Sequence, residues 1–160
     1  MHGKLFVVFA LTLPLLGCSI QQQIEHVNKR LNAPLCVVNN PGVRSGVLDS
    51  VLLTLSSREV NYRLVHNRSA AQACDWALTY DARWSVDLGS YMSSAAIQVY
   101  RGGRPAGHAI YDASNGRGHP DKYVQVQPKI VELVDELFSR VNINKADPVQ
   151  RSRKAVPQDL

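Results

Sequence analysis

The feature that most constrains the fold is an unbroken alternation of side chains in the middle of the chain. One set of positions carries mainly large or apolar side chains: Trp76, Leu78, Tyr80, Ala82, Trp84 and Val86. The set between them is smaller or polar: Ala77, Thr79, Asp81, Arg83, Ser85 and Asp87. Successive side chains of a strand point to opposite faces, so a period of two is typical of an antiparallel strand with one buried face. We therefore predict a long strand over residues 76–86, with the Asp81–Arg83 face toward water.

Two further strands are predicted directly after this one. Residues 93–100 continue the alternation, and residues 105–113 repeat it. The intervening sequence Arg-Gly-Gly-Arg at 101–104 indicates a hairpin, because glycine supplies the positive φ that tight turns need. The central part of the chain is thus expected to form an antiparallel meander.

Apolar residues recur at helical spacing on both sides of this meander. The predicted helices cover residues 45–57 and residues from about 126 to 141, and short strands are predicted at 35–38 and 61–66. Elements in this order favour an α+β fold. The specific expectation is a two-layer sandwich, with a mixed or antiparallel sheet and two main helices packed on one face.

The first residues have the layout of a secretory signal. His2 and Lys4 give a positive end, and an apolar run follows over residues 5–16. This run is shorter than the roughly 20 residues that a membrane-spanning helix needs. The pattern indicates export from the cytoplasm.

The sequence Leu15-Leu16-Gly17-Cys18 follows, and it resembles the lipobox of bacterial lipoproteins. In that family the cysteine thiol takes a diacylglyceryl group, and a small residue lets the signal peptidase reach the bond before it. The resemblance implies that residues 1–17 are a signal peptide and that Cys18 is the lipid-attachment residue. Two alternatives are an ordinary signal peptide with a cysteine near its end, and a buried N-terminal strand.

The lipobox resemblance also implies a compartment. Palmitate and other acyl chains on Cys18 would hold the mature protein to a membrane, because two or three chains bind far more firmly than one. In enteric bacteria an aspartate after the cysteine tends to retain lipoproteins at the inner membrane. Ser19 therefore favours the periplasmic face of the outer membrane.

The cysteine count fits this compartment. With Cys18 lipidated, Cys36 and Cys74 remain as an even pair in an oxidising space, and we predict a disulfide between them. Such a bridge would stabilise the folded chain by roughly 3–4 kcal/mol in the chain-entropy model, because it closes a loop in the unfolded chain. The alternatives are two separate buried thiols or a metal pair, although the spacing and the lack of nearby histidines fit zinc poorly.

The predicted organisation has four parts. Residues 1–17 are the signal peptide, 18–33 a tether with a short amphipathic helix, 34–142 a single α+β domain, and 143–160 a disordered basic tail. The formal net charge of +5 does not indicate nucleic acid as a partner, because the signal sends the chain away from the genome. An envelope protein is the expected partner beside the membrane.

Beyond the lipobox, the order of elements resembles small periplasmic α/β modules of envelope lipoproteins. Examples are the N-terminal domain of the Tol translocation protein and the lipoprotein activators of penicillin-binding proteins. The chain is also similar to families of small proteobacterial envelope lipoproteins that have no assigned role. These resemblances rest on pattern alone, and no functional residue is carried over from them.

Two functional hypotheses follow. The first is a non-enzymatic binding or accessory module for another envelope component, with no cofactor, no metal and no catalytic residue. The second is a cell-wall or lipid hydrolase, or its regulatory subunit, with a site near His108 and Asp112. A serine nearby, Ser90, Ser93 or Ser94, would complete the residue types of a triad, but no Gly-x-Ser-x-Gly elbow is present. The Arg-Gly-Gly-Arg hairpin could cradle an anion, although a solvated hairpin tip is the favoured explanation.

Overall fold

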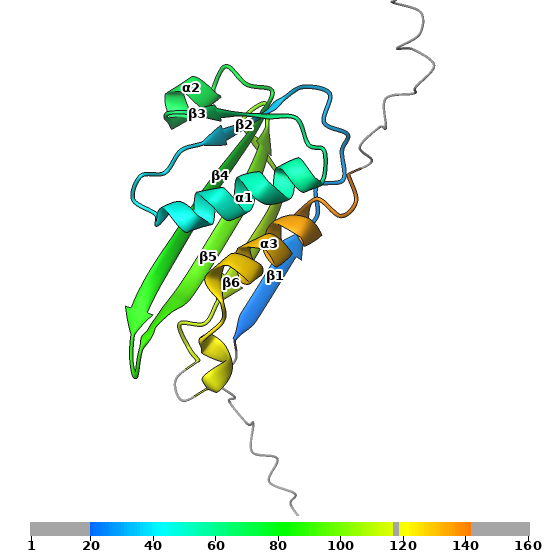
Figure 1. Cartoon of the computed structure of the whole chain (residues 1–160). Coiled ribbons are helices and arrows are strands. Elements are labelled where there is room, and N and C mark those ends of the chain that lie inside the picture. Colours follow the sequence, from blue (N-terminus) through cyan, green and yellow to red (C-terminus); the bar gives the residue numbers. More distant parts are fainter. Residues whose placement is uncertain (1–19, 117–118, 142–160) are drawn as a thin grey trace, which may run out of the picture.

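The computed structural model describes residues 20–116 and 119–141, which form one mixed six-stranded sheet with helices on it (Figure 1). The strands are β1 (Gln21–Glu25), β2 (Leu35–Val38), β3 (Tyr62–Val65), β4 (Trp76–Val86), β5 (Ser90–Arg101) and β6 (Arg104–Asp112). The helices are α1 (Ser45–Ser57), α2 (Arg68–Ala71) and α3 (Val126–Leu137), with a 3-10 turn η1 (Pro120–Lys122). The strand order is β1-β6-β5-β4-β2-β3, so the sheet is open at β1 and β3. This architecture confirms the predicted α+β class.

The predicted signal peptide, Cys18 and the basic tail at 143–160 lie outside the described residues. No helix in the described part of the chain is long and apolar enough to cross a membrane.

The alternating strand is β4, and its two faces are as the pattern predicts from Trp76 to Ala82. Beyond the register shift between Arg83 and Trp84 the prediction is wrong for Val86, which is exposed because the strand there runs past the covering helices. Trp76 and Leu78 are fully buried, whereas Asp81 and Arg83 are exposed. The buried face packs under α1 and α3, which lie side by side on the same side of the sheet (Figure 1). The hairpin partners β5 and β6 continue the buried face through Ile97 and Tyr111. Period-two patterning therefore determines which face of the sheet the helices cover.

The sheet is mixed because β2 pairs in parallel with both β3 and β4. All four residues of β2 are buried, so the strand does not alternate in sequence. Leu35 and Val37 lie opposite Trp76 and Leu78 and so share the face that the two long helices cover. Cys36 and Val38 point to the opposite face, where the short helix α2 packs.

The N-terminal segment differs from the prediction. The sequence pattern predicts a short helix within residues 18–33, but Gln21–Glu25 forms β1 and pairs antiparallel with β6. A helix this short has little stability of its own, and pairing with β6 satisfies the backbone along what would otherwise be an open sheet edge. The domain therefore begins at least as early as Ile20, and not at residue 34.

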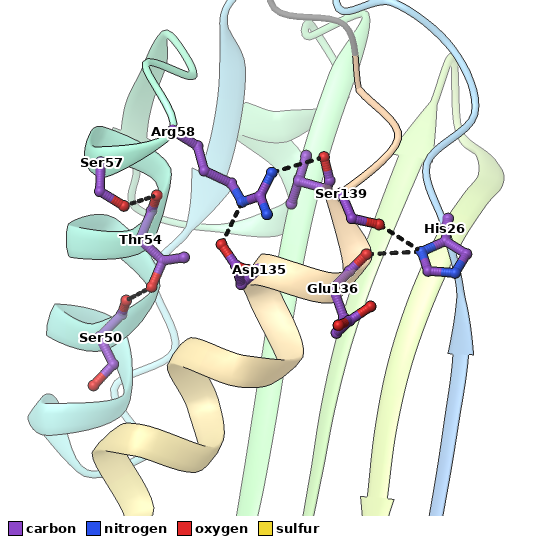
Figure 2. A network of polar contacts seen from close by, with 9 residues as sticks. His26, Ser50, Thr54, Ser57, Arg58, Asp135, Glu136 and Ser139 are labelled. Carbon is purple, nitrogen blue, oxygen red and sulfur yellow. Dashed lines mark hydrogen bonds and ion pairs between the residues drawn. The ribbon is translucent and has the colours of Figure 1, made fainter.

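A polar network ties the two long helices to each other and to the segment after β1 (Figure 2). Arg58, at the end of α1, donates from Nε to Asp135 Oδ1 of α3 at 2.6 Å, and from Nη1 to the carbonyl of Phe138 at 3.3 Å. His26 Nδ1 lies 2.7 Å from the carbonyl oxygen of Glu136. A carbonyl can only accept, so the His26 ring nitrogen is the donor in this contact. The network fixes both helices relative to the sheet edge.

Candidate functional site

A cavity of about 360 Å³ lies on the face of the sheet opposite α1 and α3. Its floor comes from β4 and β5, where Ala77 lies directly opposite Tyr100. One wall comes from α2 and the residues after it. The lining residues are Val38, Arg68, Ala71, Gln72, Cys74, Ala77, Thr79, Tyr100, Gly102 and Gly103. Small side chains on the strands leave room that larger ones would fill.

A disulfide between Cys36 and Cys74 holds this wall in place and confirms the predicted pair. It links β2, which lies between the edge strand β3 and β4, to the chain just after α2, with the two Cα atoms 6.3 Å apart. Arg63 of β3 lies beside the bridge, with Nε 3.0 Å from Cys36 Sγ and Nη2 3.3 Å from Cys74 Sγ. Because α2 is only one turn long, this covalent tie and its flanking arginine position it more firmly than helix propensity could.

Local capping also sets the start of α2. The side chain of Asn67 accepts a hydrogen bond from the backbone N–H of Ala70 at 2.8 Å, which satisfies one of the free donors of the first turn. Apolar periodicity does not predict this helix, because four residues are too few for a periodic pattern. The Asn67 cap was the available signal.

The β5–β6 hairpin forms the rim of the cavity. Gly102 and Gly103 both have positive φ, +53° and +75°, and a Cβ atom at either residue would have no neighbouring atom within 4 Å. Glycine is therefore required here by the backbone turn alone. Arg101 is already engaged, since it lies over the Trp76 ring and 3.9 Å from Asp75. This engagement makes the hairpin a poorer anion cradle than its sequence suggests.

A second, more polar hollow of about 660 Å³ lies beside the same hairpin. It is lined by Glu25, His26, Asn28, Lys29, Asp75, Arg101, Gly102, Arg104, Pro105 and Ala106. Its charged lining residues are of both signs: Glu25 and Asp75 are acidic, and Lys29, Arg101 and Arg104 are basic. The two hollows share Gly102 of the β5–β6 hairpin, so both lie at this end of the sheet.

The residues of the hydrolase hypothesis are not brought together. His108 and Asp112 lie on one face of β6, four residues apart, which corresponds to about 13 Å along a strand. Nδ1 of His108 lies 3.2 Å from Glu25 Oε2, while Asp112 accepts a hydrogen bond from the backbone N–H of Ser114. Hydrogen bonds from the side chain and then the backbone of Ser114 lower the pKa of Asp112. Neither residue lines the two hollows described above.

The serines of that hypothesis are also dispersed. Ser94 lies opposite Asp112 on the neighbouring strand, Ser93 is buried, and Ser90 begins β5. Within residues 20–116 and 119–141, no group of three or more His, Cys, Asp or Glu side chains could hold a metal ion.

Comparison with known proteins gives limited similarity. No protein-family model matches the chain, and no curated protein matches it. Among solved structures, the PelC dodecamer from Paraburkholderia phytofirmans is 11% identical, with a TM-score of 0.48, over 78% of this chain and 99% of that chain. A point variant of the same protein is 12% identical, also with a TM-score of 0.48, over 76% and 97% of the two chains. Similarity at this level transfers no function or assembly, which depend on particular residues.

Proposed function

We propose that the chain is a lipid-anchored lipoprotein of the bacterial envelope, attached through Cys18 to the periplasmic face of the outer membrane. In this proposal it acts as a non-enzymatic binding or accessory module for another envelope protein. The cavity beneath α2 is the binding site. It takes an apolar side chain of the partner, with Arg68 and Gln72 at its wall for polar contact.

The observation that carries this proposal is the separation of the cavity from the start of the domain. Gln21 begins β1 and lies in one row with Asp112, Ser94 and Arg83 across the sheet. The floor residue Ala77 is six residues from Arg83 along β4, or about 20 Å. A domain tethered at Cys18 would thus hold the membrane at one end and present the cavity at the other.

The chemistry of the cavity supports protein recognition. Its volume lies within the range of specific ligand sites, and its strand floor is made of small and apolar side chains. The ring of Tyr100 adds an aromatic surface, and its hydroxyl already donates to Gln98 Oε1 at 2.6 Å. Aromatic residues with an engaged hydroxyl are frequent anchors at interfaces.

A photocrosslinking experiment in the native host tests the proposal. A photoreactive phenylalanine analogue replaces Tyr100 at the cavity, and in a matched variant it replaces Leu53, which is 66% exposed on the outer side of α1. We expect a discrete crosslink to one envelope protein from position 100 and none from position 53. Filling the cavity with Ala77→Phe should abolish the crosslink, whereas His108→Ala should leave it intact.

Two results would contradict the proposal. Equal crosslinks from both positions would show nonspecific proximity, and a crosslink that survives Ala77→Phe would place the contact outside the cavity. Loss of the crosslink in His108→Ala would instead favour the site of the hydrolase hypothesis.

A further inference from the structure

The β4–β5 hairpin ends in exposed apolar side chains. Val86 is 82% exposed and Leu88 is 97% exposed, and the partly exposed Tyr123 lies beside them, with its Cε1 3.8 Å from a Cβ position at Gly89. Single exposed leucines are common, but several exposed apolar side chains close together on a protruding tip indicate an interaction site. We propose that this tip inserts into the lipid surface to which Cys18 is attached; the inference rests on the lipid anchor of the proposed function.

The register of the sheet places the tip beyond the row in which β1 begins, at the end of the sheet nearest to Cys18 in sequence. Arg83 and Gln21 lie in the same row across the sheet, and β4 continues from Arg83 for three more residues to Val86. Three residues of strand cover about 10 Å, so the tip protrudes by that distance past the row. Cys18 precedes Gln21 by three residues and can lie at most about 10 Å from it.

The directions also agree. β1 is antiparallel to β6, β6 to β5, and β5 to β4, so the chain before Gln21 leaves the sheet at the end where β4 runs out to its tip (Figure 1). Three strand spacings separate β1 from β4, which is about 14 Å across the sheet. A lipid on Cys18 would therefore bring the bilayer surface to the tip, and the two contacts together would orient the domain.

Short contacts connect the start of the domain to the tip through the intervening loop. A Cβ at Gly116 would lie 3.4 Å from Ile20 Cγ1 and 3.6 Å from Lys122 Cβ. Lys122 in turn forms an ion pair with Asp87 at the hairpin turn. These contacts hold the tip in a fixed position relative to Ile20, which follows Cys18 by two residues.

The charge of the tip suits a lipid interface. The Asp87 carboxylate is compensated by Lys122, whose ammonium group also lies 5.0 Å and 5.2 Å from the ring centroids of Tyr91 and Tyr123. The two rings meet edge to face with centroids 5.6 Å apart. Tyrosine is enriched where membranes meet water, and its ring and hydroxyl match the two sides of that boundary.

Brominated-lipid quenching tests the inference on the full mature protein. The lipidated protein is reconstituted in phosphatidylethanolamine–phosphatidylglycerol vesicles with brominated acyl chains, as Leu88→Trp or as the matched variant Leu64→Trp. Leu64 is an exposed leucine on β3, in the row of Leu78 and far from the tip. Trp76 and Trp84 contribute equally to both variants, so the unsubstituted protein provides the baseline.

We expect the added fluorescence of Leu88→Trp to shift to shorter wavelength and to fall by at least half with brominated chains, while that of Leu64→Trp is unchanged. Flotation measures membrane attachment separately from quenching. Protein that floats with the vesicles but shows no quenching at position 88 contradicts the tip contact and still supports the lipid anchor. A blue shift without quenching would assign a second copy of the chain to the tip. Protein that does not float overturns both proposals.

Discussion

Asp87, at the turn of the β4–β5 hairpin, forms an ion pair with Lys122 of η1, whose side chain is buried. The hydrogen bond from Lys122 to Asp87 raises the pKa of that lysine above its ordinary value of 10.5. The pair connects the protruding hairpin to the loop between β6 and α3. It therefore carries part of the stability of the end that we propose faces the membrane.

The first prediction concerns alkaline pH. A raised lysine pKa adds stability that is fully present below the ordinary value and is lost as the pH rises through the folded-state value. We expect Lys122→Met to lower the thermal midpoint by a few degrees at neutral pH, and the difference from wild type to shrink above about pH 10.5. Burial also raises the pKa of Tyr111, so the difference between the two curves is the informative quantity. Curves that stay parallel into alkali would contradict the assignment.

The second prediction concerns the disulfide. Removing it as the Cys36→Ala, Cys74→Ala double variant should lower the free energy of unfolding by about 4 kcal/mol, since the bridge closes a long loop in the unfolded chain. Urea denaturation measures this loss, and thiol reduction of the wild type is the matched control. In hydrogen exchange, the amides of α2 should lose protection before those of β4. Equal protection of α2 with and without the bridge would show that the cavity wall does not depend on it.

The third prediction concerns the contact between the two long helices. The hydrogen bond from Arg58 lowers the pKa of Asp135, so its stabilisation is present above the ordinary pKa of 3.8 and is lost as the pH falls. We expect Arg58→Ala to cost about 1 kcal/mol at neutral pH, because the Asp135 carboxylate is half exposed and screened by solvent. Arg58→Lys keeps the charge but not both hydrogen bonds, so it should retain less than half of the stabilisation that Arg58 provides. A loss from Arg58→Ala that is unchanged in acid would contradict the role of Asp135.

The fourth prediction compares two glycines near one hairpin. A Cβ at Gly107 would lie 2.8 Å from Val27 Cγ2 and 2.9 Å from the carbonyl oxygen of Glu25, so Gly107→Ala must displace the backbone at the end of β1. We expect a loss of about 2–3 kcal/mol in unfolding free energy. Gly103→Ala meets no neighbour and costs only the strain of its positive φ, about 1 kcal/mol. The reverse order of the two losses would refute the close packing at Gly107.

The parts of the fold that could be predicted are those in which one local pattern decides the answer. Residues 76–82 alternate because one face of β4 packs under helices, and the apolar stripe of α3 repeats because the same side of the helix faces that sheet. The two glycines of the β5–β6 turn were also informative, because the positive φ of the turn is a local requirement that glycine meets. In each case the local secondary structure alone decides which residue type is suitable at a position.

The parts that escaped prediction depend on distant partners. Gln21–Glu25 becomes a strand because β6 lies beside it, and nothing in those five residues requires that partner. The cavity combines β4 and β5 with α2, and its wall exists because Cys74 reaches back to Cys36. The cysteine pair was predictable by counting, but the hollow that it closes was not. His108 and Asp112 were linked in sequence by residue type, and strand geometry separates them.

The proposed function depends most on Cys18, and one measurement tests that residue directly. The protein is purified from membranes of its native host, and the mass of its N-terminal peptide is determined. We predict a mature chain that begins at Cys18 and carries two or three acyl chains on that residue. A chain that begins elsewhere, or a Cys18 peptide with an unmodified thiol and amine, would contradict the anchored arrangement.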